Sequence, residues 1–166
     1  MRRDNDQDPV ASKQGSNVRI RRMSPADIPE VAVLEAQNFS MPWSEKGFDD
    51  ALKQADNIFL VARTQDGTIA AYCGLYASTD EGEITNVAVS EKVRRQGIGV
   101  AVMEELFYRA KERGIKKIFL EVRQSNMSAR RLYDKMGFAQ CGIRKNFYER
   151  PREDAVVMCA DIEKNG

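Results

Sequence analysis

Apolar and polar residues alternate over residues 18–23, a pattern typical of a strand with one buried face. Ser24 then precedes a proline and an acidic residue, as at the start of a helix. The residues that follow lie on one face of a helix if they are helical, namely Ile28, Val31, Ala32 and Glu35. Residues 39–44 interrupt this helix, and we expect Ser44 to cap a second short helix ending near Leu52. The first 52 residues therefore predict a strand and two helices.

Three mainly apolar segments follow in close succession, at residues 58–62, 69–76 and 84–89, and each predicts a strand. Asp66 and Gly67 lie between the first two, and this pair is typical of a tight hairpin turn. A polar turn at residues 78–82 connects the second segment to the third. Consecutive strands with such short connections predict an antiparallel meander.

After the third of these strands the apolar period changes from two to about 3.6 residues, which predicts a helix. On a helical wheel, one half of this helix carries the mainly apolar residues Ile98, Gly99, Val102, Met103, Leu106, Phe107 and Ala110. Gly114 is expected to end it. Residues 117–123 predict the next strand, with Ile118, Leu120 and Val122 on one face and Phe119, Glu121 and Arg123 on the other.

The last third of the chain predicts one more helix and two strands. Ser125 or Asn126 is the expected cap, and Gly137 ends the helix with Phe138 placed for the apolar contact of a Schellman-type stop. The apolar face of this helix carries Ala129, Leu132, Tyr133 and Met136. Strands are expected at residues 139–144 and 155–162, with a loop over 147–154.

The resulting order, β-α-α-β-β-β-α-β-α-β-β, predicts an α/β fold with a mixed sheet and helices on both faces. We expect a single domain over residues 18–166. Residues 1–17 are polar and cannot bury enough apolar surface to offset the entropy of ordering, so we expect a disordered extension there.

Composition excludes several classes of function. The formal net charge is +1, so nothing global favours nucleic acid as a partner. The chain has no apolar run of transmembrane length and no signal-peptide core, so we expect a cytoplasmic protein that does not bind membranes. The cysteines, Cys73, Cys141 and Cys159, form no CxxC pair and are expected to be buried free thiols.

The chain contains no histidine. This absence excludes histidine-dependent serine and cysteine nucleophiles and the usual histidine-bearing zinc sites, and we expect no metal. Any proton transfer must therefore use Glu, Asp, Tyr, Lys, Cys or water.

A basic, glycine-bearing loop with the sequence Arg-Arg-Gln-Gly-Ile-Gly occupies residues 94–99. Glycine lets backbone N–H groups approach a ligand closely, and the helix start adds unpaired donors and the positive end of its dipole. We therefore expect a phosphorylated ligand here, with a simple tight turn as the alternative. The loop is a poor match to a P-loop or a dinucleotide fingerprint, because no Gly-Lys-Ser/Thr follows and the third glycine is absent.

Three side chains near this loop are candidates for chemistry, and each has a structural alternative. Glu121 lies in a predicted interior strand, where it can pair with Arg123 or Arg130, face solvent, or act as a general base with a raised pKa. Tyr133 is either a core residue or a general acid. Asn126 is a helix cap, or it also hydrogen-bonds an amide-bearing ligand.

Taken together, these segments resemble the GNAT superfamily of N-acetyltransferases over about residues 18–162. The resemblance rests on the Val-Ala-Val of residues 87–89, the 94–99 loop, the Leu-Glu-Val-Arg of residues 120–123, Asn126 and residues 129–138. Residues 41–45, 120–123 and 152–155 are similar to the subgroup that acetylates protein N-termini.

The resemblance implies acetyl-CoA as co-substrate, direct attack by the amine without an acyl-enzyme, and a mostly antiparallel sheet splayed at the cofactor site. It assigns the general base to Glu121 and the general acid to Tyr133. The implied cofactor-binding residues are Val87, Ala88, Val89, Arg94, Arg95, Gln96, Gly97, Ile98, Gly99, Val100 and Asn126.

The implied acceptor is the α-amino group of a protein N-terminus, either the N-terminal alanine of ribosomal protein S18 or a broader set. Phe39, Trp43, Phe147 and Tyr148 would flank its entrance, with Phe147 where relatives often carry a second tyrosine. Small amines, lysine side chains and a non-catalytic acyl-CoA-binding or nucleotide-binding role are the alternatives. We expect a monomer or weak dimer without direct nucleic-acid contact.

Overall fold

The structure is a computed structural model that describes residues 11–12 and 17–162. Its elements are β1 (Ala11–Ser12), β2 (Val18–Arg22), the 3-10 turn η1 (Pro25–Asp27), α1 (Ile28–Asn38), α2 (Glu45–Leu52), β3 (Ile58–Thr64), β4 (Ile69–Ser78), β5 (Glu81–Val89), the 3-10 turn η2 (Glu91–Val93), α3 (Ile98–Glu112), β6 (Lys117–Arg123), α4 (Met127–Lys135), β7 (Ala139–Tyr148) and β8 (Glu153–Asp161). Beyond β1 and the two 3-10 turns, this is the predicted order.

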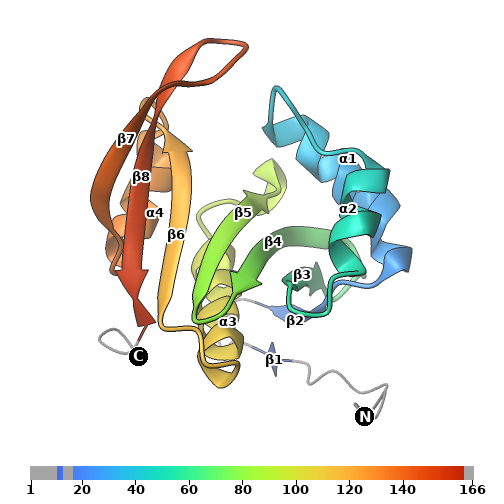
Figure 1. Cartoon of the computed structure of the whole chain (residues 1–166). Coiled ribbons are helices and arrows are strands. Elements are labelled where there is room, and N and C mark those ends of the chain that lie inside the picture. Colours follow the sequence, from blue (N-terminus) through green and yellow to red (C-terminus); the bar gives the residue numbers. More distant parts are fainter. Residues whose placement is uncertain (1–10, 13–16, 163–166) are drawn as a thin grey trace.

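The strands form one eight-stranded sheet in the order β1-β2-β3-β4-β5-β6-β8-β7 (Figure 1). Neighbouring strands from β1 to β5 are antiparallel, and so are the pairs that β8 makes with β6 and β7. Only β5 and β6 are parallel, and α3 crosses between them. The mixed, mostly antiparallel sheet confirms the predicted fold class.

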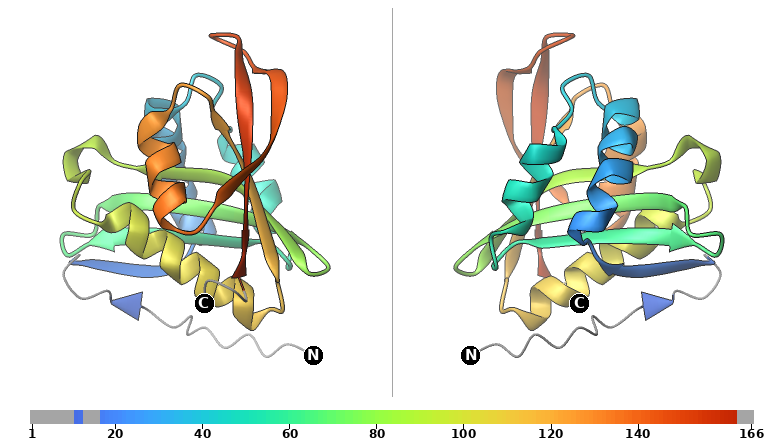
Figure 2. Two further views of the ribbon diagram at one scale, coloured as in Figure 1. Left: turned by 90° about the vertical axis from the view of Figure 1, so that its left-hand side faces the viewer. Right: turned by 90° about the vertical axis from the view of Figure 1, so that its right-hand side faces the viewer.

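Helices α1 and α2 cover one face of the sheet, and α3 and α4 cover the other (Figure 2). On the α3/α4 face, Val102, Leu106 and Tyr133 join an aliphatic core with Leu60 and Ile118. The α1/α2 face has a smaller core that is richer in aromatic residues, including Phe48, Phe59 and Tyr72. Because the same strands supply side chains to both cores, alternation along each strand decides which face a residue serves.

The helix ends follow the local signals in the sequence. The Ser44 hydroxyl accepts a hydrogen bond from the Gly47 N–H at 3.1 Å and caps α2. Gly114 and Gly137 adopt positive φ angles of 82° and 93° after α3 and α4. The Phe138 N–H donates to the Tyr133 carbonyl at 3.0 Å, as in a Schellman motif, and its side chain is buried.

Several predicted boundaries were wrong. The expected loop over residues 147–154 is shorter, because β7 continues to Tyr148 and β8 begins at Glu153, and these two residues pair. The turn is held by the Arg123 side chain, which donates to the carbonyls of Glu149 and Pro151 at 2.9 Å. Similarly, β3, β4 and β5 extend into polar residues, because the backbone ladder continues wherever a neighbouring strand is present.

Two further expectations were corrected in part. Within the expected disordered extension, Ala11 and Ser12 pair with β2, whose edge would otherwise carry unpaired backbone groups. Residues 1–10 and 13–16 of that prediction lie outside the described residues. Of the thiols expected to be buried, Cys73 is buried, Cys159 is intermediate and Cys141 is exposed, because β7 is the outer strand of the sheet.

The feature that positions the site is the short length of the β5–β6 pairing. It covers Glu81–Ile84 against Lys117–Leu120, after which the two strands diverge (Figure 1). At the same point β5 carries a bulge, since Gly74 pairs with Asn86 and Leu75 with Ile84, leaving Thr85 without its own partner. The extra residue reverses the alternation. Consequently Ile84 and Val87 serve the α3/α4 core, and Asn86 faces α1.

Asp27 fastens the start of α1 to the sheet. It is 1% exposed, and its carboxylate accepts hydrogen bonds at 2.7 Å from the guanidinium groups of Arg21 in β2 and Arg63 in β3. The Ser24 N–H adds a bond of 2.8 Å. Burial raises the pKa of this carboxyl, but the bonds from Arg21 and Arg63 lower it more, to well below its ordinary value of 3.8.

We predict that Asp27→Asn lowers the free energy of unfolding by about 3 kcal/mol, because a neutral amide cannot form the charge-assisted hydrogen bonds that the buried carboxylate accepts from Arg21 and Arg63. Urea denaturation at pH 7 measures this loss. The control is Asp49→Asn, which removes an exposed pair with Lys53 and should cost less than about 1 kcal/mol. Since the folded pKa is depressed, the contribution of Asp27 is complete above pH 3.8 and disappears as pH falls below it. A difference between Asp27→Asn and the wild type that does not shrink on acidification would contradict this.

Candidate active site

A cavity of about 290 Å³ lies where β5 and β6 diverge. Its walls come from the end of α1 and the segment after it, from β5, β6 and α4, and from the end of β7. The lining residues are Glu35, Asn38, Phe39, Ser40, Met41, Trp43, Ile84, Thr85, Asn86, Val87, Leu120, Glu121, Val122, Arg123, Asn126, Ala129, Tyr133 and Tyr148. A second hollow of about 330 Å³ adjoins it on the α1/α2 face and shares Glu121. The two predicted catalytic residues, Glu121 and Tyr133, therefore meet at one cavity, whereas the 94–99 loop is not part of its lining.

Glu121 projects from β6 on the face opposite Ile118, Leu120 and Val122, as the alternation predicts. Its side chain is 17% exposed, and its Oε1 lies 3.3 Å from Nε of Arg144 in β7. The expected partners Arg123 and Arg130 were wrong, since Arg123 pairs with Glu153 and Arg130 donates to the Gln124 carbonyl.

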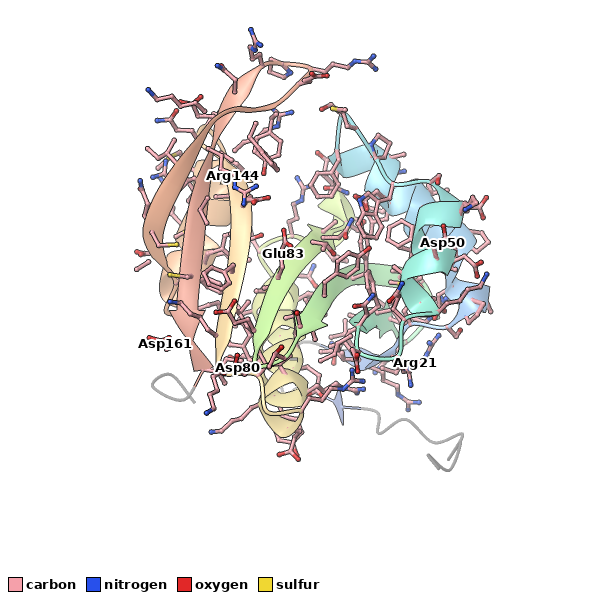
Figure 3. The ribbon with its side chains drawn as sticks, in the orientation of Figure 1. Arg21, Asp50, Asp80, Glu83, Arg144 and Asp161 are labelled. Carbon is pink, nitrogen blue, oxygen red and sulfur yellow. The ribbon has the colours of Figure 1, made fainter. Side chains whose placement is uncertain are left out.

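The electrostatic surroundings of Glu121 favour retention of a proton. Burial raises the pKa of this carboxyl, Arg144 lowers it and Glu83 raises it, with a net increase above the ordinary 4.5. Arg144 and Glu83 both lie toward the space between the β6–β8 half of the sheet and the two helices α1 and α2 (Figure 3). A carboxyl with a raised pKa is a better proton acceptor than an ordinary glutamate side chain.

Tyr133 reaches the cavity from the opposite side of the sheet. It lies on α4 within the α3/α4 core, is 8% exposed and packs edge-on against Phe138 at 5.7 Å. Burial raises the pKa of its phenol, so the group stays protonated at neutral pH. Glu121 and Tyr133 therefore line one cavity from opposite faces, and a neutral phenol can donate a proton where a carboxylate accepts one.

Asn126 is a helix cap, as one of its two interpretations predicted. Its Oδ1 accepts a hydrogen bond from the Ala129 N–H at 3.2 Å. The residue also lines the cavity, which leaves its amide N–H groups as the part of the side chain able to contact a ligand.

The 94–99 loop forms the turn into α3. Arg95 and Gly97 have positive φ angles of 67° and 77°, and a Cβ at Gly97 would meet nothing within 4 Å, so the backbone there is open to solvent. The N–H groups of Ile98, Gly99 and Val100 form the first turn of the helix, where intrahelical partners are absent. This exposed, positively polarised end can bind an anion.

Two residues of the loop are already engaged within the protein. Arg94 donates to the Val89 carbonyl at 3.2 Å and to Oδ1 of Asn38 at 2.6 Å. A Cβ at Gly99 would contact Val89 and Leu132 at 3.4 and 3.5 Å, so this glycine allows α3 to pack closely against the strand. Arg95 and Gln96 are exposed and remain the side chains of the loop that can reach a ligand.

The backbone of β5 after the bulge is hydrogen-bonded on one edge. Val87, Ala88 and Val89 pair with β4, whereas β6 has already diverged and pairs with β8 instead. Among the described residues their other edge therefore has no strand partner. It can accept an extended ligand through main-chain hydrogen bonds.

The aromatic candidates divide into those that line the cavity and one that does not. Trp43 packs against Phe48 at 5.3 Å and Tyr76 at 6.0 Å and also lines the cavity with Phe39. Tyr148 lines it too, beneath the guanidinium of Arg123. Burial raises the pKa of the Tyr148 phenol to about 12, with a further contribution from Glu121.

Phe147 is 43% exposed and lies outside this lining, although it contacts Tyr148 edge-on at 5.0 Å. The hydroxyl that a tyrosine would carry at position 147 is therefore missing from the edge of the site and not from the cavity lining.

The sequence did not reveal a buried cluster beneath the cavity. Glu35 of α1 is 3% exposed and accepts hydrogen bonds from the Tyr72 hydroxyl at 2.5 Å and from Nδ2 of Asn86 at 3.0 and 3.1 Å. Burial raises the pKa of its carboxyl. The available signal was an acidic residue on the apolar stripe of a helix, which usually indicates a buried polar partner.

Comparison with known proteins identifies the family. Residues 28–138 match the model of the Acetyltransferase (GNAT) family, and the chain belongs to it. The [ribosomal protein bS18]-alanine N-acetyltransferase of Escherichia coli is 36% identical over 145 residues, which cover 86% of this chain and 97% of that protein. The predicted family is thus confirmed.

Solved structures agree with this assignment. The crystal structure of the ribosomal-protein-S18-alanine N-acetyltransferase from Escherichia coli matches with a TM-score of 0.81 at 34% identity and covers 87% of this chain and 94% of that one. Ard1 from Thermoplasma volcanium also has a TM-score of 0.81, at 26% identity, covering 87% of this chain and 97% of that one.

Two negative findings apply to the described residues alone. They contain no group of three or more His, Cys, Asp or Glu side chains placed to hold a metal ion. None of their helices is long and apolar enough to cross a membrane.

We predict that the pKa of Glu121 responds in opposite directions to two single substitutions. Arg144→Gln removes a favourable charge and should raise it, whereas Glu83→Gln removes an unfavourable one and should lower it. Titration of the glutamate carboxyl carbons by NMR measures both shifts, with Glu121→Gln to assign the signal. Shifts of the same sign in the two variants would show that local rearrangement, rather than these charges, controls the pKa.

Proposed function

We propose that this chain transfers the acetyl group of acetyl-CoA to the α-amino group of a protein N-terminus. The main support is that Glu121 and Tyr133 line one cavity from opposite faces of the sheet. Acyl transfer from a thioester needs a base for the incoming amine and an acid for the departing thiolate. A gap in the sheet lets these two substrates approach from different sides.

On the proposed cofactor side, the start of α3 and the free edge of β5 fit the two parts of acetyl-CoA. The pyrophosphate would contact the first-turn N–H groups of Ile98, Gly99 and Val100, with Arg95 and Gln96 beside them. The amides of the pantetheine arm would pair with the backbone of residues 87–89. The amide of Asn126 would contact the same arm from the start of α4.

The proposed proton transfers follow from the two pKa values. Glu121 accepts a proton from the α-ammonium group, directly or through water, since its raised pKa is closer to neutrality than that of an ordinary carboxylate. The free amine attacks the thioester carbonyl carbon, the C–N bond forms and the C–S bond breaks, and the nitrogen and Glu121 each release one proton to solvent. Tyr133 donates its proton to the sulfur as the thiolate leaves, and solvent then restores the phenol.

On the proposed acceptor side, the aromatic side chains of Phe39, Trp43 and Tyr148 surround the approach to Glu121. The Escherichia coli relative is a [ribosomal protein bS18]-alanine N-acetyltransferase, so an alanine terminus taken from that ribosomal protein is the first acceptor to test. A small residue at the terminus is consistent with a cavity of about 290 Å³ that must also hold the reacting acetyl group.

A panel of peptides tests the proposed acceptor. Incubation with acetyl-CoA followed by mass spectrometry should give N-terminal acetylation of a bS18-derived peptide that begins with alanine. The same peptide with a blocked α-amine and a free internal lysine is the control and should remain unmodified. Acetylation of the lysine alone would show that the acceptor is a side chain, and absence of CoA release with every peptide or amine would exclude acetyl transfer.

We predict that Glu121→Gln and Tyr133→Phe each reduce turnover by roughly 10²-fold or more, as expected for loss of a general base or acid. Both changes preserve side-chain volume, so the affinity for acetyl-CoA, measured by calorimetry, should change little. Tyr108→Phe is the control, since the Tyr108 side chain is 61% exposed on α3 and does not line the cavity. Near-normal turnover in both substituted proteins would refute the assigned roles.

A further inference from the structure

The buried cluster of Glu35, Tyr72 and Asn86 fixes the orientation of one side-chain amide. These residues come from α1, β4 and β5 and are between 0% and 4% exposed. Both Glu35 carboxyl oxygens accept hydrogen bonds from the NH₂ group of Asn86, at 3.0 and 3.1 Å, so this group is held toward Glu35. The Tyr72 hydroxyl donates to the same carboxylate. The Oδ1 of Asn86 must therefore point away from Glu35.

This oxygen has no hydrogen-bond partner within the described part of the chain, although it is buried. The hydroxyl oxygen of the adjacent Thr85 is also buried and has no hydrogen-bond partner among the described residues. A buried acceptor without a donor costs about 1–3 kcal/mol, so such atoms usually serve a function or bind a missing group. The Asn86 Oδ1 and the Thr85 hydroxyl oxygen are neighbours at the bulge of β5, and they need hydrogen-bond donors from a ligand or from solvent.

The location of these atoms indicates which ligand supplies the donors. Thr85, Asn86 and Glu35 line the same cavity as Glu121. The bulge turns Asn86 to the α1/α2 face, which is also the face of Glu121 and of the proposed acceptor approach. The thioester itself carries no N–H donor, whereas the acceptor α-ammonium carries three and a positive charge.

Charge complementarity supports the same ligand. None of the lysine or arginine side chains in the described residues forms an ion pair with Glu35. A buried carboxylate without a cation is costly, and an incoming ammonium group would offset part of that cost. The negative charge also polarises the Asn86 amide, which makes its oxygen a better acceptor.

We infer that Asn86 binds the α-amino group of the acceptor through Oδ1, and that Glu35 is the positioning residue that presents this oxygen to the cavity. The inference rests on the proposed function, because the amine is the acceptor in that reaction. Asn86 holds the nitrogen on the Glu121 side of the gap, and Glu121 then takes the proton. Specificity for an amine over a hydroxyl acceptor follows, because an ammonium group supplies more donors.

Two variants test this arrangement. Asn86→Ala removes the acceptor oxygen. Glu35→Gln keeps the shape but adds an amide donor, so the Asn86 amide can turn and present its NH₂ group to the ammonium instead. Each should raise the KM for the peptide roughly tenfold or more, the effect of one hydrogen bond to a charged group. The dissociation constant for acetyl-CoA should stay within about twofold of wild type.

The matched control is Asn57→Ala, which also deletes a hydrogen bond from an asparagine Nδ2, in this case to the Ala51 carbonyl, but in the turn before β3 and outside the cavity lining. Its peptide KM should equal that of the wild type. If Asn86 and Glu35 were merely structural, their variants would lower thermal stability and turnover without a selective rise in peptide KM, and this result would overturn the inference.

A binding measurement separates this inference from the proposed function. Calorimetric titration of the CoA-loaded protein with the alanine-initiated peptide should show at least tenfold weaker binding for Asn86→Ala than for wild type. Equal binding overturns the inference even where the wild type acetylates the peptide normally. Binding without acetyl transfer by the wild type refutes the proposed function, while the comparison of the two proteins still decides the role of Asn86. Absence of both binding and transfer contradicts both proposals.

Discussion

The divergence of β5 from β6 after four paired residues is the constraint on which the rest of the site depends. Each strand keeps its other neighbour, β4 or β8, so the sheet stays intact on both sides of the opening. The opening leaves backbone groups of β5 unpaired on one edge and creates a passage between the two faces. Without it, Glu121 and Tyr133 would be separated by a continuous layer of hydrogen-bonded strands.

The bulge at Thr85 gives the two sides of this passage different chemistry. By reversing the alternation, it directs Val87 toward α3 and Asn86 toward α1 within two consecutive residues. The α3/α4 side thereby combines an apolar wall, a helix start that attracts anions and a protonated phenol. The α1/α2 side combines two carboxyls and an asparagine oxygen, which suit a cation. These are the requirements of a phosphorylated acyl donor and of an amine, respectively.

The features that the sequence predicted well depend on neighbours along the chain. The caps at Ser44 and Asn126 and the stops at Gly114 and Gly137 involve contacts within a few residues. The missed features depend on long-range pairing. Arg144 reaches Glu121 only through the β6–β8–β7 register, and Glu35 meets Asn86 from 51 positions away. Periodicity also cannot reveal a bulge. One extra residue changes which face of the sheet each later side chain occupies, but the strand still shows an alternating apolar pattern.

In the proposed reaction, donor and acceptor enter from opposite faces of the sheet and react through the gap between β5 and β6. A crystal structure with a bisubstrate analogue, in which CoA is joined through an acetyl linker to the α-amine of an alanine-initiated peptide, tests it directly. We expect CoA against α3 and α4, the peptide against α1 and the end of β7, and the linker between Thr85 and Glu121. A complex in which both halves lie on one face of the sheet, or in which the linker is remote from Glu121, would contradict it.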